Sequence, residues 1–218
     1  MARIVPDDWK NLGATGAAVR ERETLALLEK LPDDYTVYHV VHWTRINEGF
    51  SVFGEADFVV VAPFGRVLMI EMKAGFLRET GQGLVKVYLQ KERNVAIQLA
   101  RTMENLHRHF TATFGAGRHL PDREIAVLPG LYGEERGDRG RAAGRIVDAS
   151  RKAQWPRVVL DILPPDEPRF ESAERIRHFL ADELSLTPDT NVLVGAANTT
   201  LVTRLSGGLA TLGAAAGI

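Results

Sequence analysis

Residues 54–75, GEADFVVVAPFGRVLMIEMKAG, decide the fold that the sequence predicts. They contain two apolar runs, 58–61 and 67–70, which are rich in β-branched residues and bounded by turn-forming residues. Each run therefore predicts a β-strand. The Pro63-Phe64-Gly65 segment between them suits a three-residue hairpin loop, with glycine at the position that needs a positive φ.

The loop also predicts which residues of the two strands face each other. If the residues that flank the loop pair, Asp57 lies directly opposite Glu71, and Glu55 lies opposite Lys73. Directly opposed residues point to the same face of a sheet, with Cβ atoms about 4.5–5.5 Å apart. The hairpin is therefore predicted to gather two carboxylates and one ammonium group at one place.

These charged residues lie at the ends of strands that are otherwise apolar on both faces. That pattern is typical of strands covered on both sides. In one interpretation the strand end is solvated, and Lys73 forms a surface salt bridge with Glu71 or Glu55, which contributes only about 0–1 kcal/mol. In the other, a divalent cation relieves the repulsion between Asp57 and Glu71. A cation held there beside Lys73 would suit metal-assisted phosphodiester hydrolysis.

Five pieces of the sequence, in this order and spacing, resemble the nuclease-related domain (NERD) family, a branch of the PD-(D/E)xK nucleases. They are ERETLALL at 21–28, LPDDY at 31–35, GEADFVVV at 54–61, MIEMKAG at 69–75 and NVAIQ at 94–98. The likeness covers roughly residues 15–130. The family often has Gly before the helix glutamate and Pro after the asparagine, where this chain has Arg20 and Val95.

The resemblance implies a restriction-endonuclease-like fold, which is an α/β three-layer α/β/α domain with a mixed central sheet and an αβββαβ core. It also implies a divalent-metal-dependent nuclease acting on DNA, with Mg²⁺ or Mn²⁺ as the cofactor. The implied metal ligands are Asp57, Glu71 and the backbone carbonyl of Met72.

The resemblance assigns roles to three further side chains. Lys73 would orient or deprotonate the attacking water and offset charge in the transition state. Gln98, at the start of a helix, would fix the lysine or the water, and Glu21 could support a second metal ion. Glu23 is an alternative for the family's helix glutamate. Without the resemblance, Glu21 is an acidic residue favourably placed near a helix N-terminus.

Composition limits the other function classes. With 45% hydrophobic and 25% charged residues, the 218-residue chain reads as a globular protein with a real core. It has no cysteine, which excludes disulfides, thiolate catalysis and cysteine-ligated zinc and suits a cytoplasmic protein. No signal peptide or run of 18 apolar residues is visible, so no membrane association is expected.

The net charge of −1 means that any attraction to phosphate must be local. Residues 136–157 hold seven basic and two acidic side chains, which predicts either a DNA-attracting surface or a solvated Gly/Arg loop. A histidine–metal site at His39 and His42 is not expected, because an odd separation places them on opposite faces of a strand.

The remaining segments are predicted from their periodicity and turn residues. They are a loose arm at 1–14, helices at 16–30, 94–114 and 170–184, strands at 35–43, 84–88 and 124–128, a polar loop at 45–53, and further short strands at 145–147 and 157–162. The expected organisation is an N-terminal arm at 1–14, a nuclease-related domain at 15–186 and a Gly/Ala/Thr-rich tail or linker at 187–218.

The sequence thus predicts a nuclease domain in DNA processing, repair or defence, with DNA favoured over RNA as the partner and a helicase as a possible fused or associated protein. Its first competitor is a catalytically inactive nucleic-acid-binding or docking module within a larger helicase-type protein. A structural oligomerisation domain is a third reading, which the charged cluster at the hairpin end disfavours. The sequence leaves the oligomeric state open.

Overall fold

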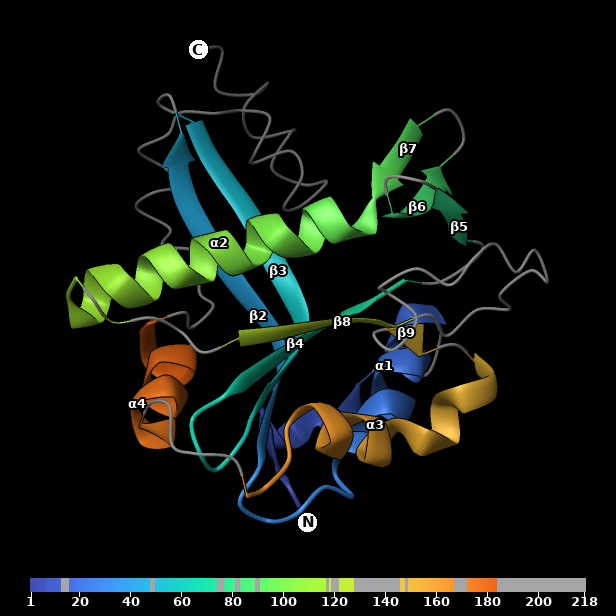
Figure 1. The fold of residues 1–218 in the computed structure, drawn as a ribbon, viewed down its shortest axis with the longest axis horizontal. Coiled ribbons are helices and arrows are strands. Elements are labelled where there is room, and N and C mark those ends of the chain that lie inside the picture. Colours follow the sequence, from blue (N-terminus) through green and yellow to red (C-terminus); the bar gives the residue numbers. More distant parts are fainter. Residues whose placement is uncertain are drawn as a thin grey trace, which may run out of the picture.

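A six-stranded mixed sheet forms the centre of the molecule (Figure 1). The computed structural model describes residues 1–12, 16–47, 50–73, 77–80, 83–88, 91–116, 118, 122–127, 146–147, 149–166 and 172–183. The strands, in their order across the sheet, are β1 (Arg3–Val5), β2 (Thr36–Asn47), β3 (Phe50–Val61), β4 (Val67–Met72), β8 (Asp122–Val127) and β9 (Ile146–Val147). The pairs β2–β3 and β3–β4 are antiparallel, whereas β1–β2, β4–β8 and β8–β9 are parallel.

Helices cover both faces of this sheet. The helices are α1 (Gly16–Leu28), α2 (Val95–Phe114), α3 (Trp155–Ile162) and α4 (Ala173–His178), with shorter turns η1 (Asp7–Asn11), η3 (Ala149–Gln154) and η4 (Phe179–Glu183). One buried cluster joins α2 and α4 to Val59 and Met69 of the sheet. A second cluster joins α1 and α3 to Phe58 and Ile70, which point to the other face. The predicted α/β three-layer architecture with an αβββαβ core is therefore confirmed.

The β3–β4 hairpin has the predicted loop and register. Gly65 has a φ of 79°, and its N–H donates to the carbonyl of Ala62 at 3.0 Å. The ladder runs from Val61 opposite Val67 to Phe58 opposite Ile70. The positive φ is the reason why glycine is needed at the end of this loop.

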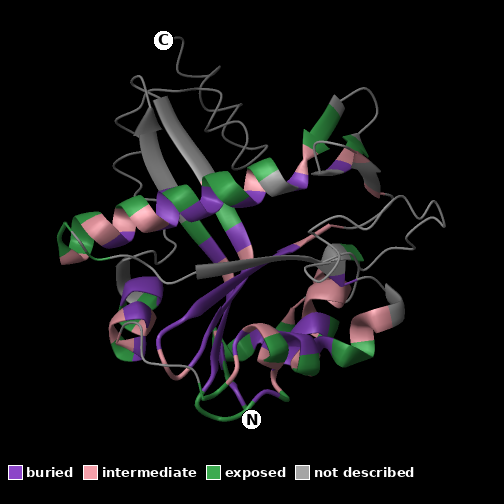
Figure 2. Ribbon diagram, in the orientation of Figure 1, coloured by how far each residue is buried: buried purple, intermediate pink, exposed green. Residues whose placement is uncertain are grey.

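Helix α2 also follows its prediction. The side-chain oxygen of Asn94 accepts a hydrogen bond from the N–H of Ile97 at 3.1 Å and so caps the helix. The predicted apolar stripe is buried, namely Val95, Leu99, Met103, Leu106 and Phe110. Figure 2 shows this division of α2 into a buried and an exposed side.

A small antiparallel sheet lies between β4 and α2 in the sequence. It consists of β5 (Leu77–Thr80), β6 (Gly83–Tyr88) and β7 (Lys91–Asn94), in the order β5-β6-β7. The sequence predicted only the second of these strands. Figure 1 shows the small sheet at the start of α2, separate from the central sheet.

Three local predictions are wrong. The expected loose arm contains β1, which pairs with β2, and a buried Trp9, so hydrophobic burial fixes this segment. The expected polar loop at 45–53 is largely strand, because β2 and β3 extend to Asn47 and from Phe50. The expected strand at 157–162 belongs to α3, in which Pro156 occupies the first turn.

Helix α4 and the η4 turn occupy most of the predicted helix at 170–184. The predicted tail at 187–218 and half of the basic region, residues 136–145 and 148, lie outside the described residues. No helix in the described part of the chain is both long and apolar enough to cross a membrane.

Candidate active site

Glu71 is the centre of the candidate site. It follows the buried run of β4 and is itself only 1% exposed. Two donors, Lys73 Nζ and Gln98 Nε2, bind the same carboxylate oxygen, Oε1, the latter at 2.6 Å. The other oxygen, Oε2, is buried and has no hydrogen-bond partner among the described residues. A buried carboxylate oxygen without a donor is costly, so this atom marks a place where a positive group would be stabilising.

Two different elements bring these donors together. Lys73 follows β4 directly, and alternation along the strand puts its ammonium on the same side as Glu71, where its side chain is 13% exposed. Gln98 lies in the first turn of α2, which the Asn94 cap holds in place. The structure therefore brings Glu71, Lys73 and Gln98 into contact.

Asp57 lies next to this group on β3. Its Oδ2 accepts a hydrogen bond of 2.5 Å from the backbone N–H of Met72. This side-chain contact takes over where the β3–β4 ladder ends, one residue beyond the pair of Phe58 and Ile70. Asp57 is thereby fixed to the strand that carries Glu71.

The backbone is irregular on the other side of Asp57 as well. The described β2–β3 ladder pairs His39 with Phe58 and Val41 with Ala56, and it skips Val40 and Asp57 between them. Val40 has a φ of 57°, which a β-branched residue rarely adopts. Such conformations cost on the order of 1–3 kcal/mol and concentrate at functional sites.

Burial and mutual repulsion make both carboxylates hard to ionise. Burial, followed by the charge of Glu71, raises the pKa of Asp57 to about 7, although the Met72 N–H and Lys73 act in the opposite direction. Burial also raises the pKa of Glu71, against the attraction of Lys73. Without a further positive group, the site therefore favours the protonated form of these two carboxyl groups.

The chemistry of these residues fits a hard divalent cation, which prefers oxygen ligands. Asp57 and Glu71 supply carboxylate oxygens, and the partnerless Oε2 of Glu71 provides a free acceptor. The charge of a third carboxylate, Glu55, also raises the pKa values of Asp57 and Glu71, but its Oε2 lies 3.5 Å from His42. Within the described residues, no group of three or more His, Asp or Glu side chains could hold a metal.

Glu21 makes a different contact from the one implied by the resemblance. Its Oε2 lies 3.2 Å from Nε2 of His39, whose side chain is 5% exposed and stacks on Phe58. Phe58 belongs to the buried cluster on the α1 face of the sheet, whereas Met69, two residues before Glu71, belongs to the α2 face. Glu21 and Glu71 therefore point toward opposite faces.

The alternative helix glutamate, Glu23, bonds to Lys152, and both side chains are partly exposed. Of the two candidates, only Glu21 contacts the sheet through a described hydrogen bond. Glu55 lies 3.5 Å from Nδ1 of His42 in β2. It contacts β2 rather than Lys73.

The contact between His39 and Glu21 was not predicted. The sequence raised His39 only for a zinc site shared with His42, which was not expected, whereas His39 contacts a carboxylate 18 residues earlier. Burial lowers the pKa of His39, while Glu21 acts to raise it. The usable signal was Glu21 on the apolar stripe of a helix, because a half-buried carboxylate needs a partner.

Comparison with known proteins supports a family relationship. The sequence model described as the nuclease-related domain matches residues 16–129. No curated protein matches the chain. The crystal structure of protein VC1899 from Vibrio cholerae is similar over 68% of this chain and 33% of that protein, with 12% identity and a TM-score of 0.39. The chain thus spans about a third of that protein's length.

Proposed function

The chain belongs to the nuclease-related domain family. We propose that it is a divalent-metal-dependent nuclease domain that hydrolyses phosphodiester bonds in DNA. The observation that carries the proposal is the buried, partnerless Oε2 of Glu71 beside Asp57, whose pKa is raised to about 7. A purely structural salt bridge would not need a second carboxylate there. The biological setting would be DNA processing, repair or defence.

Asp57, Glu71 and the Met72 carbonyl would hold Mg²⁺ or Mn²⁺. When bound, the ion polarises a phosphate and lowers the pKa of its bound water. Asp57 must lose its proton before it can act as a ligand, so the raised pKa couples ion binding to proton release.

Lys73 and Gln98 would act from the protein side. The Lys73 ammonium is held at Glu71 Oε1, where it can orient the attacking water and offset the negative charge that grows on the phosphate. Gln98 donates to the same oxygen and so fixes the carboxylate in one orientation. Glu21 contacts His39 on the opposite face of the sheet, so no part in the chemistry is proposed for it.

The direct test is an incubation of the purified chain with labelled single-stranded, duplex and flapped DNA in Mg²⁺ or Mn²⁺. Cleavage that needs the ion and is lost in Asp57→Asn and Glu71→Gln is expected. Cleavage retained in both variants would contradict the proposal, since these residues would then not carry the chemistry.

A catalytically inactive nucleic-acid-binding or docking module, as part of a larger helicase-type protein, is the second candidate. It is favoured by the contact of Lys73 with Glu71, which already offsets one carboxylate without an ion. In that case Asp57→Asn and Lys73→Ala would leave the biological function intact, and wild type would cleave none of the substrates.

A further inference from the structure

The small sheet β5–β7 is joined at both ends to the candidate site. Lys73 precedes β5 by four positions, and Gln98 follows the end of β7 by four positions. Both residues bind Glu71. The small sheet is therefore only a few residues away from Lys73 and Gln98 along the chain.

The segment from β5 to the second turn of α2 is locally basic. Residues 77–101 contain five Lys or Arg and two Asp or Glu, a net charge of +3, within a chain whose net charge is −1. The rest of the chain therefore carries a net negative charge. A basic surface on an otherwise acidic protein attracts polyanions to that one place.

Two of these basic residues stand side by side on the small sheet. Lys86 of β6 is directly opposite Arg93 of β7 in the register. Directly opposed residues share a face, so the pair places two cations on one side of the small sheet. A phosphate group that docks there can bind both side chains.

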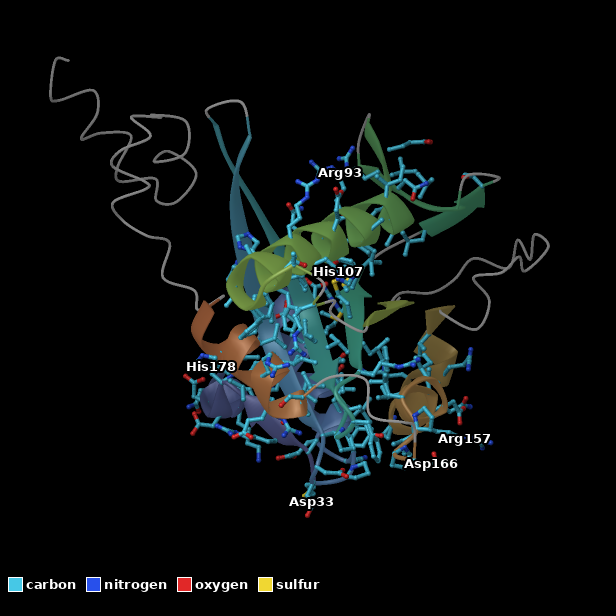
Figure 3. The ribbon with its side chains drawn as sticks, turned by 60° about the vertical axis from the view of Figure 1, so that its left-hand side comes forward. Asp33, Arg93, His107, Arg157, Asp166 and His178 are labelled. Atoms are coloured by element: carbon cyan, nitrogen blue, oxygen red, sulfur yellow. The ribbon has the colours of Figure 1, made fainter. Side chains whose placement is uncertain are left out.

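The exposed side of α2 continues this surface. Ile97 and Arg101 lie four residues apart on the exposed side of α2, and Arg93, near the end of β7, is exposed as well. Of the described large hydrophobic side chains, Met1, Val87 and Ile97 are the exposed ones. Ile97 adds apolar area to this surface, whereas Val87 follows Lys86 in β6 and points to the opposite face of the small sheet. Figure 3 shows Arg93 at the outer side of α2, far from Asp33. Interfaces with DNA are polar and much more positively charged than interfaces between proteins.

We propose that β5–β7 and the start of α2 form a docking surface for duplex DNA, on which Lys86, Arg93 and Arg101 bind backbone phosphates beside the Glu71 site. This deepens the proposed function, on which it rests for the identity of the nucleic acid. Charge complementarity and continuity with the candidate site argue for DNA as the occupant. Phosphate contacts of this kind position the strand and carry no sequence information.

The test measures binding without cleavage. Fluorescence anisotropy with a labelled 20-base-pair duplex in EDTA gives the affinity as a function of KCl concentration. Each lost phosphate contact should reduce the slope of log K against log [KCl] by about 0.9 for duplex DNA. Arg93→Gln and Arg101→Gln should each show this smaller slope. Raising KCl from 50 to 200 mM should therefore lower the affinity of each variant about 3.5-fold less than it lowers that of wild type. Their melting temperatures should stay unchanged, because both side chains are exposed.

Arg157→Gln is the matched control. Arg157 is also exposed, but it lies on α3, away from Arg93 (Figure 3). The inference is overturned if wild type, Arg93→Gln and Arg101→Gln have equal slopes. It is also overturned if only Arg157→Gln changes the slope, or if wild type does not bind the duplex. Binding that depends on Arg93 but never leads to cleavage in Mn²⁺ would instead overturn the nuclease function and leave the docking surface standing.

Discussion

The side-chain amide of Gln98, in the first turn of α2, donates a 2.6 Å hydrogen bond to Oε1 of Glu71, in β4. This contact joins the first turn of a helix to a sheet carboxylate over 27 residues. Lys73 binds the same oxygen, so both donors lie at Oε1, whereas Oε2 has no partner among the described residues. This second oxygen is what makes Glu71 a candidate metal ligand.

Metal binding should stabilise the folded protein. Mn²⁺ binds the native carboxylate pair by mass action, which raises stability by about 2.7 kcal/mol at a concentration of 100 Kd. We expect millimolar Mn²⁺ to raise the melting temperature of wild type, and Asp57→Asn to remove most of that rise. Asp33→Asn, at an exposed turn residue, is the control and should respond as wild type does. An equal response of Asp57→Asn would place the ion elsewhere.

Lys73→Ala should lower both stability and cleavage. The sequence alone predicts a surface bridge with little effect on folding, but the structure places Lys73 against a carboxylate that is 1% exposed. Removing one partner of a buried pair costs about 3–5 kcal/mol. Thermal melting should show this loss, and Lys152→Ala, which breaks the more exposed pair with Glu23, should not.

The catalytic part of the Lys73 effect can be separated from the structural part. In the double variant Lys73→Ala, Glu71→Gln the buried charge is gone, so melting should recover relative to Lys73→Ala while cleavage stays absent. At a temperature where Lys73→Ala is folded, cleavage should fall by about 10²–10³, as for one preorganised electrostatic donor. Near wild-type cleavage there would show that the active site lies elsewhere.

Without metal, stability should decrease as the pH rises. The pKa of Asp57 is raised from 3.8 to about 7 in the folded state, so between these values the folded protein holds a proton that the unfolded chain has released. The free energy of unfolding then falls with pH, by up to about 1.4 kcal/mol per pH unit and carboxyl group. Above about pH 7 Asp57 is ionised in both the folded and the unfolded state, and its contribution to the decrease ends.

Chemical denaturation in EDTA at several pH values measures this decrease. The lowered pKa of His39 acts in the opposite sense below the ordinary histidine value of 6.5, since the unfolded chain then binds the extra proton. The difference between wild type and Asp57→Asn isolates the aspartate. Parallel curves for the two proteins would mean that Asp57 is ionised in the folded state at all pH values tested.

Glu21→Gln should keep most of the cleavage activity. Glu21 contacts His39 on the α1 face of the sheet, and glutamine can still hydrogen-bond the imidazole. Glu21→Ala removes this partner of a buried ring and should cost about 1–3 kcal/mol of stability. Steady-state cleavage and thermal melting of both variants test this, with Glu23→Gln as the control. Loss of cleavage in Glu21→Gln at unchanged stability would show that Glu21 contacts the metal or the substrate.

The sequence predicted those parts of the protein whose structure depends on residues close together in the chain. The loop with Gly65 determines the β3–β4 register, and the stripe from Val95 to Phe110 with the Asn94 cap determines α2. Both rest on short-range geometry.

The parts that were not predicted depend on contacts between distant segments. Val158 and Val159 form a short apolar run that suits a strand or a helix equally, and burial of Trp155 in the α1–α3 cluster is part of what favours the helix. The contact between His39 and Glu21 requires α1 to lie on one face of the sheet, and sequence spacing does not show this. In the same way, the loss of the ladder pair at Val40 and Asp57 follows from tertiary geometry at the site.

The first strand has a practical consequence for anyone who trims this protein to its family match. That match begins at residue 16, whereas β1 and Trp9 lie before it. Removing them would turn β2 into an open edge strand with a row of unpaired backbone groups and would uncover apolar surface. Exposed edges of this kind template association between chains, so the shortened protein is expected to aggregate even though its matched domain is intact.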